Sequence, residues 1–206
     1  SPFLSKSIFT LQLFMLMCCS SFANVDLFRQ ARTLQHEGKY VEAIDAFKDY
    51  LLQPMDENSL DKQQLLIYSE ALMQLMNTFQ SKGEPEACVS TLEELYHASP
   101  ILQKECLRDY CSIMGYALSR TEKMKEAEEM TLKVFSMPLN FATPERYFRD
   151  YAYAAAVFYS NPNYQKEVTD WCIEALEQAQ LCKNTSGRQW VTAMLGSIYK
   201  RNGQLS

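Results

Sequence analysis

One pattern of small, aromatic and apolar residues recurs along this chain four times and begins a fifth time. The first copy consists of Leu27, Ala31, Leu34, Gly38, Tyr40, Ala43, Phe47, Tyr50 and Pro54. Similar frames begin near residues 69, 108, 148 and 189, so successive copies lie 39 to 42 residues apart. Self-similarity at a nearly constant spacing is the signature of a repeat architecture, in which each unit buries its apolar face against its neighbours.

Each copy is predicted to form two helices joined by a turn. In the third copy, Gly115 and Leu118 belong to the first helix, whereas Ala127 and Thr131 belong to the second. Their spacing approximates that of helices with one buried face. Small residues let two helices approach closely, and on the first helices they are Ala31, Gly115, Ala155 and Gly196. Because no sustained apolar–polar alternation occurs, the sequence predicts an all-α domain of stacked helical hairpins.

Local signals mark where two of the first helices begin. Thr143, Pro144 and Glu145 have the order of a helix cap, a first-turn proline and a first-turn acid. Asn58 and Ser59 can cap a helix that begins near residue 60. Both starts lie shortly before a repeat frame, those near residues 69 and 148, which agrees with the hairpin assignment.

The first 23 residues differ from the rest of the chain. Lys6 is their only charge, and residues 8–19 are apolar except for Thr10 and Gln12. Such a run is too short to span a bilayer but suits a signal peptide, and Ala23 ends a small-x-small cleavage site. We therefore expect a signal peptide at 1–23 and a repeat domain at 24–206. The alternatives are a buried first helix or a lipoprotein, although residues 15–17 lack the small side chains of a lipoprotein processing site.

The composition argues against nucleic-acid binding. Of the 206 residues, 47% are hydrophobic and 22% charged, as in folded globular proteins, and the net charge is −5. No run of Lys and Arg exceeds two residues, so the chain offers little neutralisation of phosphates. Arginine and aromatic residues alternate over residues 146–153, but a helix would distribute them over several faces as packing residues.

Signals for catalysis, metals and cofactors are missing from the sequence. Phosphate loops, dinucleotide-binding glycines, zinc-protease motifs and nucleophile elbows do not occur. His36 and His97 are far apart and have no recognisable nucleophile partner. The acidic cluster around Glu126 is interspersed with Lys and is typical of a solvated helix face. We therefore predict a protein that is not an enzyme and that needs neither a cofactor nor a metal.

The cysteines allow two interpretations. Export would permit disulfides, and Cys172 with Cys182 or Cys106 with Cys111 are conceivable pairs. The favoured interpretation is that Cys111 and Cys172, together with Cys88, act as small hydrophobic residues that pack between helices.

The repeat pattern resembles the tetratricopeptide repeat (TPR). That family places small residues on a first helix, Gly-x-Tyr at the turn, and Ala, Phe and a closing Pro afterwards. Gly38, Tyr40, Ala43 and Phe47 match it closely, whereas later copies match loosely, as when Cys88 takes the place of Ala. The resemblance implies a right-handed α-solenoid of about four and a half repeats over residues 24–206. The spacing exceeds the family's period of about 34 residues, so extra turns or longer connections, such as residues 55–61, must absorb the excess.

In this family the first helices line a concave groove that binds protein or peptide segments, which are therefore the implied partners. Residues on the first helices but off the packing stripe, Asp109 among them, are expected to face this groove. The contact candidates are Arg32, His36, Asn77, Tyr116, Arg120, Arg149, Tyr159, Trp190 and Lys200. Aromatic and Arg side chains commonly anchor bound partners, although the same side chains also serve as packing between repeats.

The fifth copy stops at Ser206, before a second helix, and a repeat array needs a capped end. We therefore expect this chain to be the N-terminal part of a longer protein. An exported TPR array resembles the sensory region of bacterial membrane regulators, which implies a periplasmic sensing segment that could pair as a homodimer. It would meet the membrane only through the signal peptide or a span beyond Ser206. The alternatives are a free adaptor or assembly chaperone of the cell envelope, and an accessory subunit of an enzyme complex.

Overall fold

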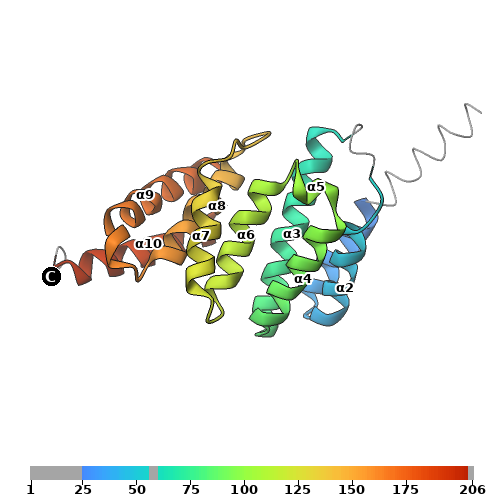
Figure 1. Cartoon of the computed structure of the whole chain (residues 1–206), viewed down its shortest axis with the longest axis horizontal. Coiled ribbons are helices and arrows are strands. Elements are labelled where there is room, and N and C mark those ends of the chain that lie inside the picture. The colour runs from blue at the N-terminus through green and yellow to red at the C-terminus, as the bar shows by residue number, and fades with distance from the viewer. Residues whose placement is uncertain (1–24, 56–59, 204–206) are drawn as a thin grey trace, which may run out of the picture.

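The structure, a computed structural model, describes residues 25–55 and 60–203. Within these residues every regular element is helical and no strand occurs, which confirms the predicted all-α class (Figure 1). The elements are a helix at residues 25–36, α2 (Tyr40–Leu51), α3 (Lys62–Lys82), α4 (Pro85–Ala98), α5 (Pro100–Gln103), α6 (Leu107–Ser119), α7 (Met124–Val134), α8 (Pro144–Phe158), the 3-10 turn η1 (Pro162–Tyr164), α9 (Gln165–Leu181) and α10 (Thr185–Arg201). The predicted signal peptide, residues 1–23, lies outside the described residues.

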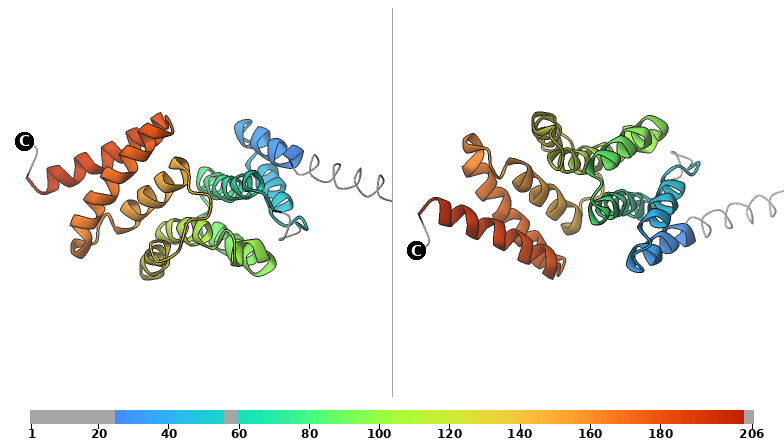
Figure 2. Two further views of the ribbon diagram at one scale, coloured as in Figure 1. Left: turned by 90° about the horizontal axis from the view of Figure 1, so that it is seen from above. Right: turned by 90° about the horizontal axis from the view of Figure 1, so that it is seen from below.

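The helices form a row of stacked hairpins. The helix at 25–36 precedes α2, α3 pairs with α4, α6 with α7 and α8 with α9, while α10 begins a fifth unit. Figure 1 shows these hairpins following one another along the long axis, from α2 at one end to α10 at the other, and Figure 2 shows the same order from above and below. Helices of neighbouring hairpins also touch, since α6 contacts α3, α4 and α8. The frames found in the sequence therefore correspond to successive hairpins.

Local chemistry explains where the helices begin and end. Thr143 caps α8 as predicted, because its side chain accepts a hydrogen bond from the backbone N–H of Arg146 and Pro144 follows at the first position. At α3 the cap is Asp61, which forms a reciprocal capping box with Gln64. The predicted caps, Asn58 and Ser59, lie outside the described residues, and the helix expected to begin near residue 60 begins at Lys62. The turn after α3 depends on Gly83, whose φ of 76° is readily adopted only by glycine.

Small residues let the two helices of a hairpin approach closely, as the sequence predicts. Ala31 and Ala155 are completely buried. A Cβ atom on Gly115 would overlap Thr131 Oγ1 and would lie 3.3 Å from the carbonyl oxygen of Ala127. Aromatic side chains fill the space beside these crossings. Trp171 of α9, for example, lies parallel to the ring of Phe135 with centroids 5.3 Å apart.

Inserted turns account for the long repeat spacing. The short helix α5 follows α4 directly, and Ser99 begins it by accepting a hydrogen bond from the backbone N–H of Leu102. The turn η1 lies between α8 and α9 in the same way. These added turns lengthen individual repeats. They do not interrupt the hydrophobic core between the hairpins, since Ile101 and Leu102 of α5 are part of it.

The cysteines of the described residues are free thiols, so neither conceivable disulfide is present there. Cys88, Cys111 and Cys172 are buried in the hydrophobic core, in agreement with the favoured packing role. Burial raises the pKa of Cys88 to about 12 and that of Cys111 and Cys172 to about 11, which keeps these thiols protonated. No helix in the described ranges is long and apolar enough to cross a bilayer.

Candidate functional site

One pocket of the described residues lies where the three first helices α6, α8 and α10 converge. It has a volume of about 740 Å³ and is bordered by the C-terminal halves of α6 and α8, by α10, and by the start of α7. Four of the nine contact candidates line it: Tyr116 and Arg120 near the end of α6, Tyr159 at the end of α8, and Trp190 on α10. The structure thus brings together residues that are up to 74 positions apart in the sequence.

Two of the rings that line this pocket, Tyr116 and Trp190, pack against a third ring, that of Tyr153, which does not line the pocket. Tyr116 stacks on Tyr153 with centroids 4.4 Å apart and planes 14° apart. Trp190 packs edge-on against both rings, at 6.0 Å from Tyr116 and 6.3 Å from Tyr153. Tyr153 is buried, and burial raises its pKa above the usual range. These contacts hold Trp190 in place while 36% of its surface remains exposed, so it presents a rigid aromatic face.

Polar groups surround these rings. The side chain of Asn161 donates a hydrogen bond to Glu128 Oε1 at 2.8 Å, which fixes the carboxylate on one side. The guanidinium of Arg201 lies 4.3 Å from the ring centroid of Tyr159 and also donates to the Tyr159 carbonyl oxygen at 3.1 Å. Arg120 is exposed at the pocket edge. The pocket therefore combines an aromatic surface with one cationic side chain, Arg120, and one carboxylate, Glu128, in its lining.

Four other candidates lie away from this pocket. Arg32 and His36 belong to the helix at 25–36, Asn77 lies on α3, and Lys200 is exposed near the end of α10. None of the four lines the pocket. Arg32 donates instead to Gln35 Oε1 at 2.9 Å. The structure therefore separates the predicted contact residues into one cluster and several isolated positions.

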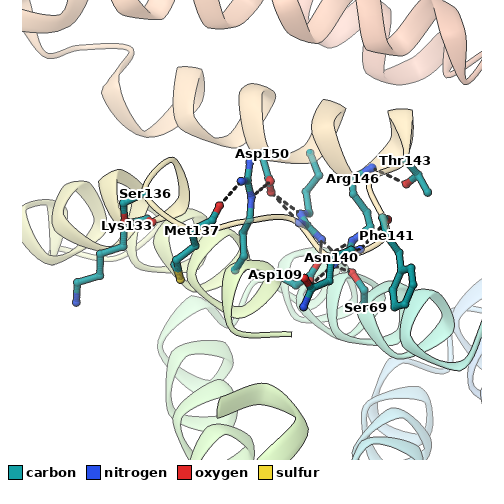
Figure 3. A network of polar contacts seen from close by, with 12 residues as sticks. Ser69, Asp109, Lys133, Ser136, Met137, Asn140, Phe141, Thr143, Arg146 and Asp150 are labelled. Atoms are coloured by element: carbon teal, nitrogen blue, oxygen red, sulfur yellow. Dashed lines mark hydrogen bonds and ion pairs between the residues drawn. The ribbon is translucent and has the colours of Figure 1, made fainter. Parts of the chain in front are cut away.

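The ninth candidate, Arg149, lies inside the array. It is 3% exposed, and its guanidinium forms ion pairs with Asp109 on α6 at 2.6 Å and with its neighbour Asp150 at 2.7 Å. The expectation that Arg149 and Asp109 face an open groove thus gives way to a buried network, which Figure 3 shows between α8 and α6. The small part of Arg149 that stays accessible borders a pocket of about 290 Å³, which Glu70 and Glu145 also line.

Asp109 is the centre of this network. Arg146 donates to Oδ1 and Oδ2 at 3.0 and 2.5 Å, and Arg149 donates to Oδ1 at 2.6 Å. Ser69, from α3, donates to the same oxygen at 2.7 Å. Burial alone would raise the pKa of Asp109, but the two guanidiniums and the Ser69 hydroxyl lower it to about 2. The carboxylate is therefore charged although it is fully buried.

The second carboxylate extends the network to the connection between α7 and α8. Asp150 accepts from Arg149 at 3.1 and 2.7 Å and from Arg108 at 2.9 Å. Arg108 also donates to the carbonyl oxygen of Met137 at 2.5 Å, while Arg146 donates to the carbonyl oxygens of Asn140 and Phe141. Three hairpins and one loop are thus joined by charged groups. Within the described residues these contacts are structural, and they leave the aromatic pocket as the candidate site.

The described residues contain no group of three His, Cys, Asp or Glu side chains placed to hold a metal ion. A third pocket, of about 520 Å³, lies between α4, α6 and α7 and is lined by the stacked rings of Tyr96 and Tyr110, whose centroids are 4.6 Å apart. It lies mainly on second helices, apart from the cluster of contact candidates.

Comparison with models of protein families and with curated protein sequences finds no match. Among solved structures, this chain is similar to the nearly identical TPR-like repeats of a Podosopora anserina protein assigned as a kinesin light chain, with a TM-score of 0.53 and 15% identity over 87% of each chain. A single-substitution variant of those repeats gives a TM-score of 0.54 and 16% identity over 87% of this chain and 86% of that one. Together with the stacked hairpins, these similarities show that the chain has a TPR-like α-solenoid fold.

Proposed function

We propose that this chain is a non-catalytic scaffold that binds an extended peptide or protein segment on its first-helix face, with the aromatic pocket as the anchor point. The observation that carries the proposal is the convergence of Tyr116, Tyr159 and Trp190 from three different first helices on one pocket. A segment that crosses this face would contact three repeats at once, which suits an extended ligand.

The composition of the pocket suggests what its ligand carries. An aromatic or apolar side chain packed against Trp190 and Tyr116 would remove apolar surface from water, at about 25 cal/mol per Å². Arg120 at the border would favour a carboxylate or a backbone carbonyl on the ligand. Aromatic and Arg residues in such partly enclosed positions commonly dominate the energy of an interface.

The proposal is tested with peptides selected for binding. Random 12-residue peptides displayed on phage are selected on the 206-residue chain, and the affinity of a selected peptide is measured for the original chain and for Trp190→Ala. We expect at least a tenfold loss, roughly 1.4 kcal/mol or more. Phe135→Ala is the matched control, because Phe135 is similarly exposed (37%) and stacked on a ring but lies directly after α7, outside the pocket. Equal effects of the two substitutions would contradict the proposal.

We further propose that the scaffold is exported and serves as the periplasmic sensing segment of a bacterial two-component-type sensor or transcriptional regulator. Support comes from the apolar run at residues 8–19 and the cleavage signal ending at Ala23. Expression in a Gram-negative host followed by mass spectrometry should find a periplasmic protein that begins at Asn24. An uncleaved cytoplasmic product would contradict export.

The gene sequence after codon 206 separates the sensor from its alternatives. An apolar span of about 20 residues followed by an output domain would support the sensor. A stop codon would support a free adaptor or assembly chaperone of the envelope. Stable co-purification with a catalytic partner would favour an accessory subunit of an enzyme complex.

A further inference from the structure

The space between α4, α6 and α7 has a counterpart one repeat later, between α7, α8 and α9. In each of the three second helices, the buried stripe contains residues spaced by four and then three positions. These residues are Cys88, Leu92 and Leu95 in α4, Ala127, Thr131 and Val134 in α7, and Val168, Cys172 and Ala175 in α9. Gly115 and Ala155 are the equivalent small residues of α6 and α8. The two spaces can therefore be compared position by position.

Three aromatic side chains fill the later of the two spaces. Phe135 directly follows the stripe of α7, and Trp171 directly precedes Cys172 in α9. Tyr151 lies four residues before Ala155 in α8. The ring of Phe135 stacks on Trp171, with centroids 5.3 Å and planes 4° apart, and on Tyr151, with centroids 5.8 Å apart. The chain's own rings thus pack the space between α7 and α9.

The earlier space keeps one of these rings and lacks the other two. Tyr96 directly follows the stripe of α4, but Cys111 stands in the position of Tyr151. Met130 likewise stands in the position of Trp171. Tyr96, Cys111 and Met130 line the pocket of about 520 Å³, which we call the second-helix pocket. Its volume lies within the range of about 300–1,000 Å³ found for small-molecule sites. Because a thiol and a thioether replace two large rings, this pocket has room for a planar ring.

A buried hydroxyl supplies a polar group at this pocket. Tyr110 lines the pocket, stacks on Tyr96 with centroids 4.6 Å apart, and is only 6% exposed. Its hydroxyl has no hydrogen-bond partner in the part of the chain that the structure describes. Burial and the charge of Glu93 raise the pKa of Tyr110 above its usual range, so the hydroxyl stays neutral and can both donate and accept. Because an unpaired buried hydroxyl is unfavourable, a ligand with a polar ring atom would gain a hydrogen bond there.

We propose that the second-helix pocket binds a free heteroaromatic compound of about the size of an indole, whose ring N–H pairs with the Tyr110 hydroxyl. The ring would lie against Tyr96 as the indole of Trp171 lies against Phe135. Helices α4, α6 and α7 already provide the walls, so only the ring is missing, and a free compound suffices to supply it. This site shares no lining residue with the aromatic pocket and adds a second ligand to the proposed scaffold.

Binding is measured with 5-fluoroindole, whose fluorine resonance is followed by NMR as the 206-residue chain is added. We expect a saturable shift or broadening with a dissociation constant of roughly 0.1–1 mM, as is usual for a ligand of so few atoms. N-acetyl-5-fluorotryptophanamide carries the same ring on a piece of backbone. It should bind more weakly, because its amide groups would lie against the apolar side chains of Leu107 and Met137.

Substitutions that fill the pocket make the result specific. Met130→Trp supplies the ring of the following repeat and should weaken binding at least tenfold. Urea denaturation should show it to be as stable as the original chain, since Trp171 fits the equivalent position. Cys111→Tyr, which supplies the other missing ring, should also weaken binding. Leu132→Trp is the matched control, because Leu132 is exposed (41%) on α7 outside the pocket, and it should change the affinity less than twofold. Tyr110→Phe, which removes only the hydroxyl, should weaken binding about threefold to tenfold.

Four outcomes would overturn the proposal. The first is the absence of a saturable response, and the second is binding to Met130→Trp as tight as to the original chain. The third is tighter binding of the capped tryptophan than of 5-fluoroindole, which would assign the pocket to a side chain of a partner protein. The fourth is a response that Trp190→Ala abolishes, because 5-fluoroindole would then occupy the aromatic pocket instead. The peptide test of the aromatic pocket is independent of the first three.

Discussion

At the scale of single residues, the buried charges between α6 and α8 are the most consequential feature. Asp109 is fully buried and neutralises part of the charge of Arg146 and Arg149, while Asp150 pairs with Arg149 and Arg108. Removing one member of such a group leaves the remaining buried charges without a partner. That loss costs far more than the loss of an exposed ion pair, because desolvation is no longer compensated.

We therefore predict that Asp109→Asn lowers the free energy of unfolding by roughly 3–5 kcal/mol. The substitution keeps the size of the side chain but removes the charge that both guanidiniums face. Urea denaturation monitored by circular dichroism measures the change. Asp45→Asn, at an exposed position on α2, is the control and should stay within about 0.5 kcal/mol of the original chain. A similar result for the two variants would show that the network does not stabilise the fold.

The lowered pKa of Asp109 also predicts how stability depends on pH. Because the folded-state pKa is about 2, below the usual value of 3.8, Asp109 stabilises the fold fully above pH 4. This contribution, on the order of 2 kcal/mol, is lost as the pH falls from about 4 to about 2. The urea concentration at the midpoint of unfolding, measured between pH 6 and pH 2, should decrease as the pH falls from about 4 to about 2. The decrease should be smaller for Asp109→Asn than for the original chain. An equally steep fall in the variant would assign the acid sensitivity to other groups.

At the scale of elements, two glycines in equivalent repeat positions have opposite surroundings. Gly115 is enclosed by α7, whereas Gly196 faces open space. The intrinsic helix propensity of Ala is higher than that of Gly, so Ala would stabilise either helix by up to about 1 kcal/mol. Whether that gain is realised depends on the room available for one additional methyl group.

We predict that Gly115→Ala destabilises the chain by about 1–3 kcal/mol, because the methyl group overlaps Thr131 Oγ1. Gly196→Ala should stabilise it by up to about 1 kcal/mol, because the helix gains propensity without a clash. Thermal unfolding of both variants provides the comparison. Changes of the same sign in both would mean that α7 does not pack against Gly115 as described.

At the scale of the whole molecule, packing is strongest in the middle of the array. The network connects α3, α6 and α8, whereas α10 has only Val191 and Ile198 fully buried. Stability in stacked repeats is roughly the sum of local and neighbouring contributions, so units with fewer buried contacts open more readily.

Hydrogen exchange should therefore be slowest in α6 and α8 and markedly faster in α10. Exchange measured by mass spectrometry on the 206-residue chain gives the protection of each helix. In Asp109→Asn, protection should fall in α6 and α8 more than in α2, which has no member of the network. Uniform protection along the array would contradict this description.

The sequence predicted the architecture better than the site. Small residues such as Gly115 and the cap at Thr143 have local signatures, so the hairpins and several helix boundaries could be derived from spacing alone. The convergence of Tyr116, Tyr159 and Trp190 depends on how three repeats stack, which spacing does not determine. Arg149 shows the limit most clearly, because its burial depends on Asp109, 40 positions earlier in the chain. The only sequence signal for this contact was that two residues of opposite charge, Asp109 and Arg149, stand one repeat length apart.

The most direct test of the proposed scaffold uses the two tryptophans of the chain. Their indole N–H groups give two resonances in a ¹⁵N–¹H correlation spectrum, which are assigned with a Trp190→Phe variant. When a selected peptide is added, we predict that the Trp190 signal shifts in proportion to occupancy, whereas that of Trp171, packed between Phe135 and Phe158, stays in place. A peptide that binds but leaves the Trp190 signal unmoved would show that the aromatic pocket is not the binding site.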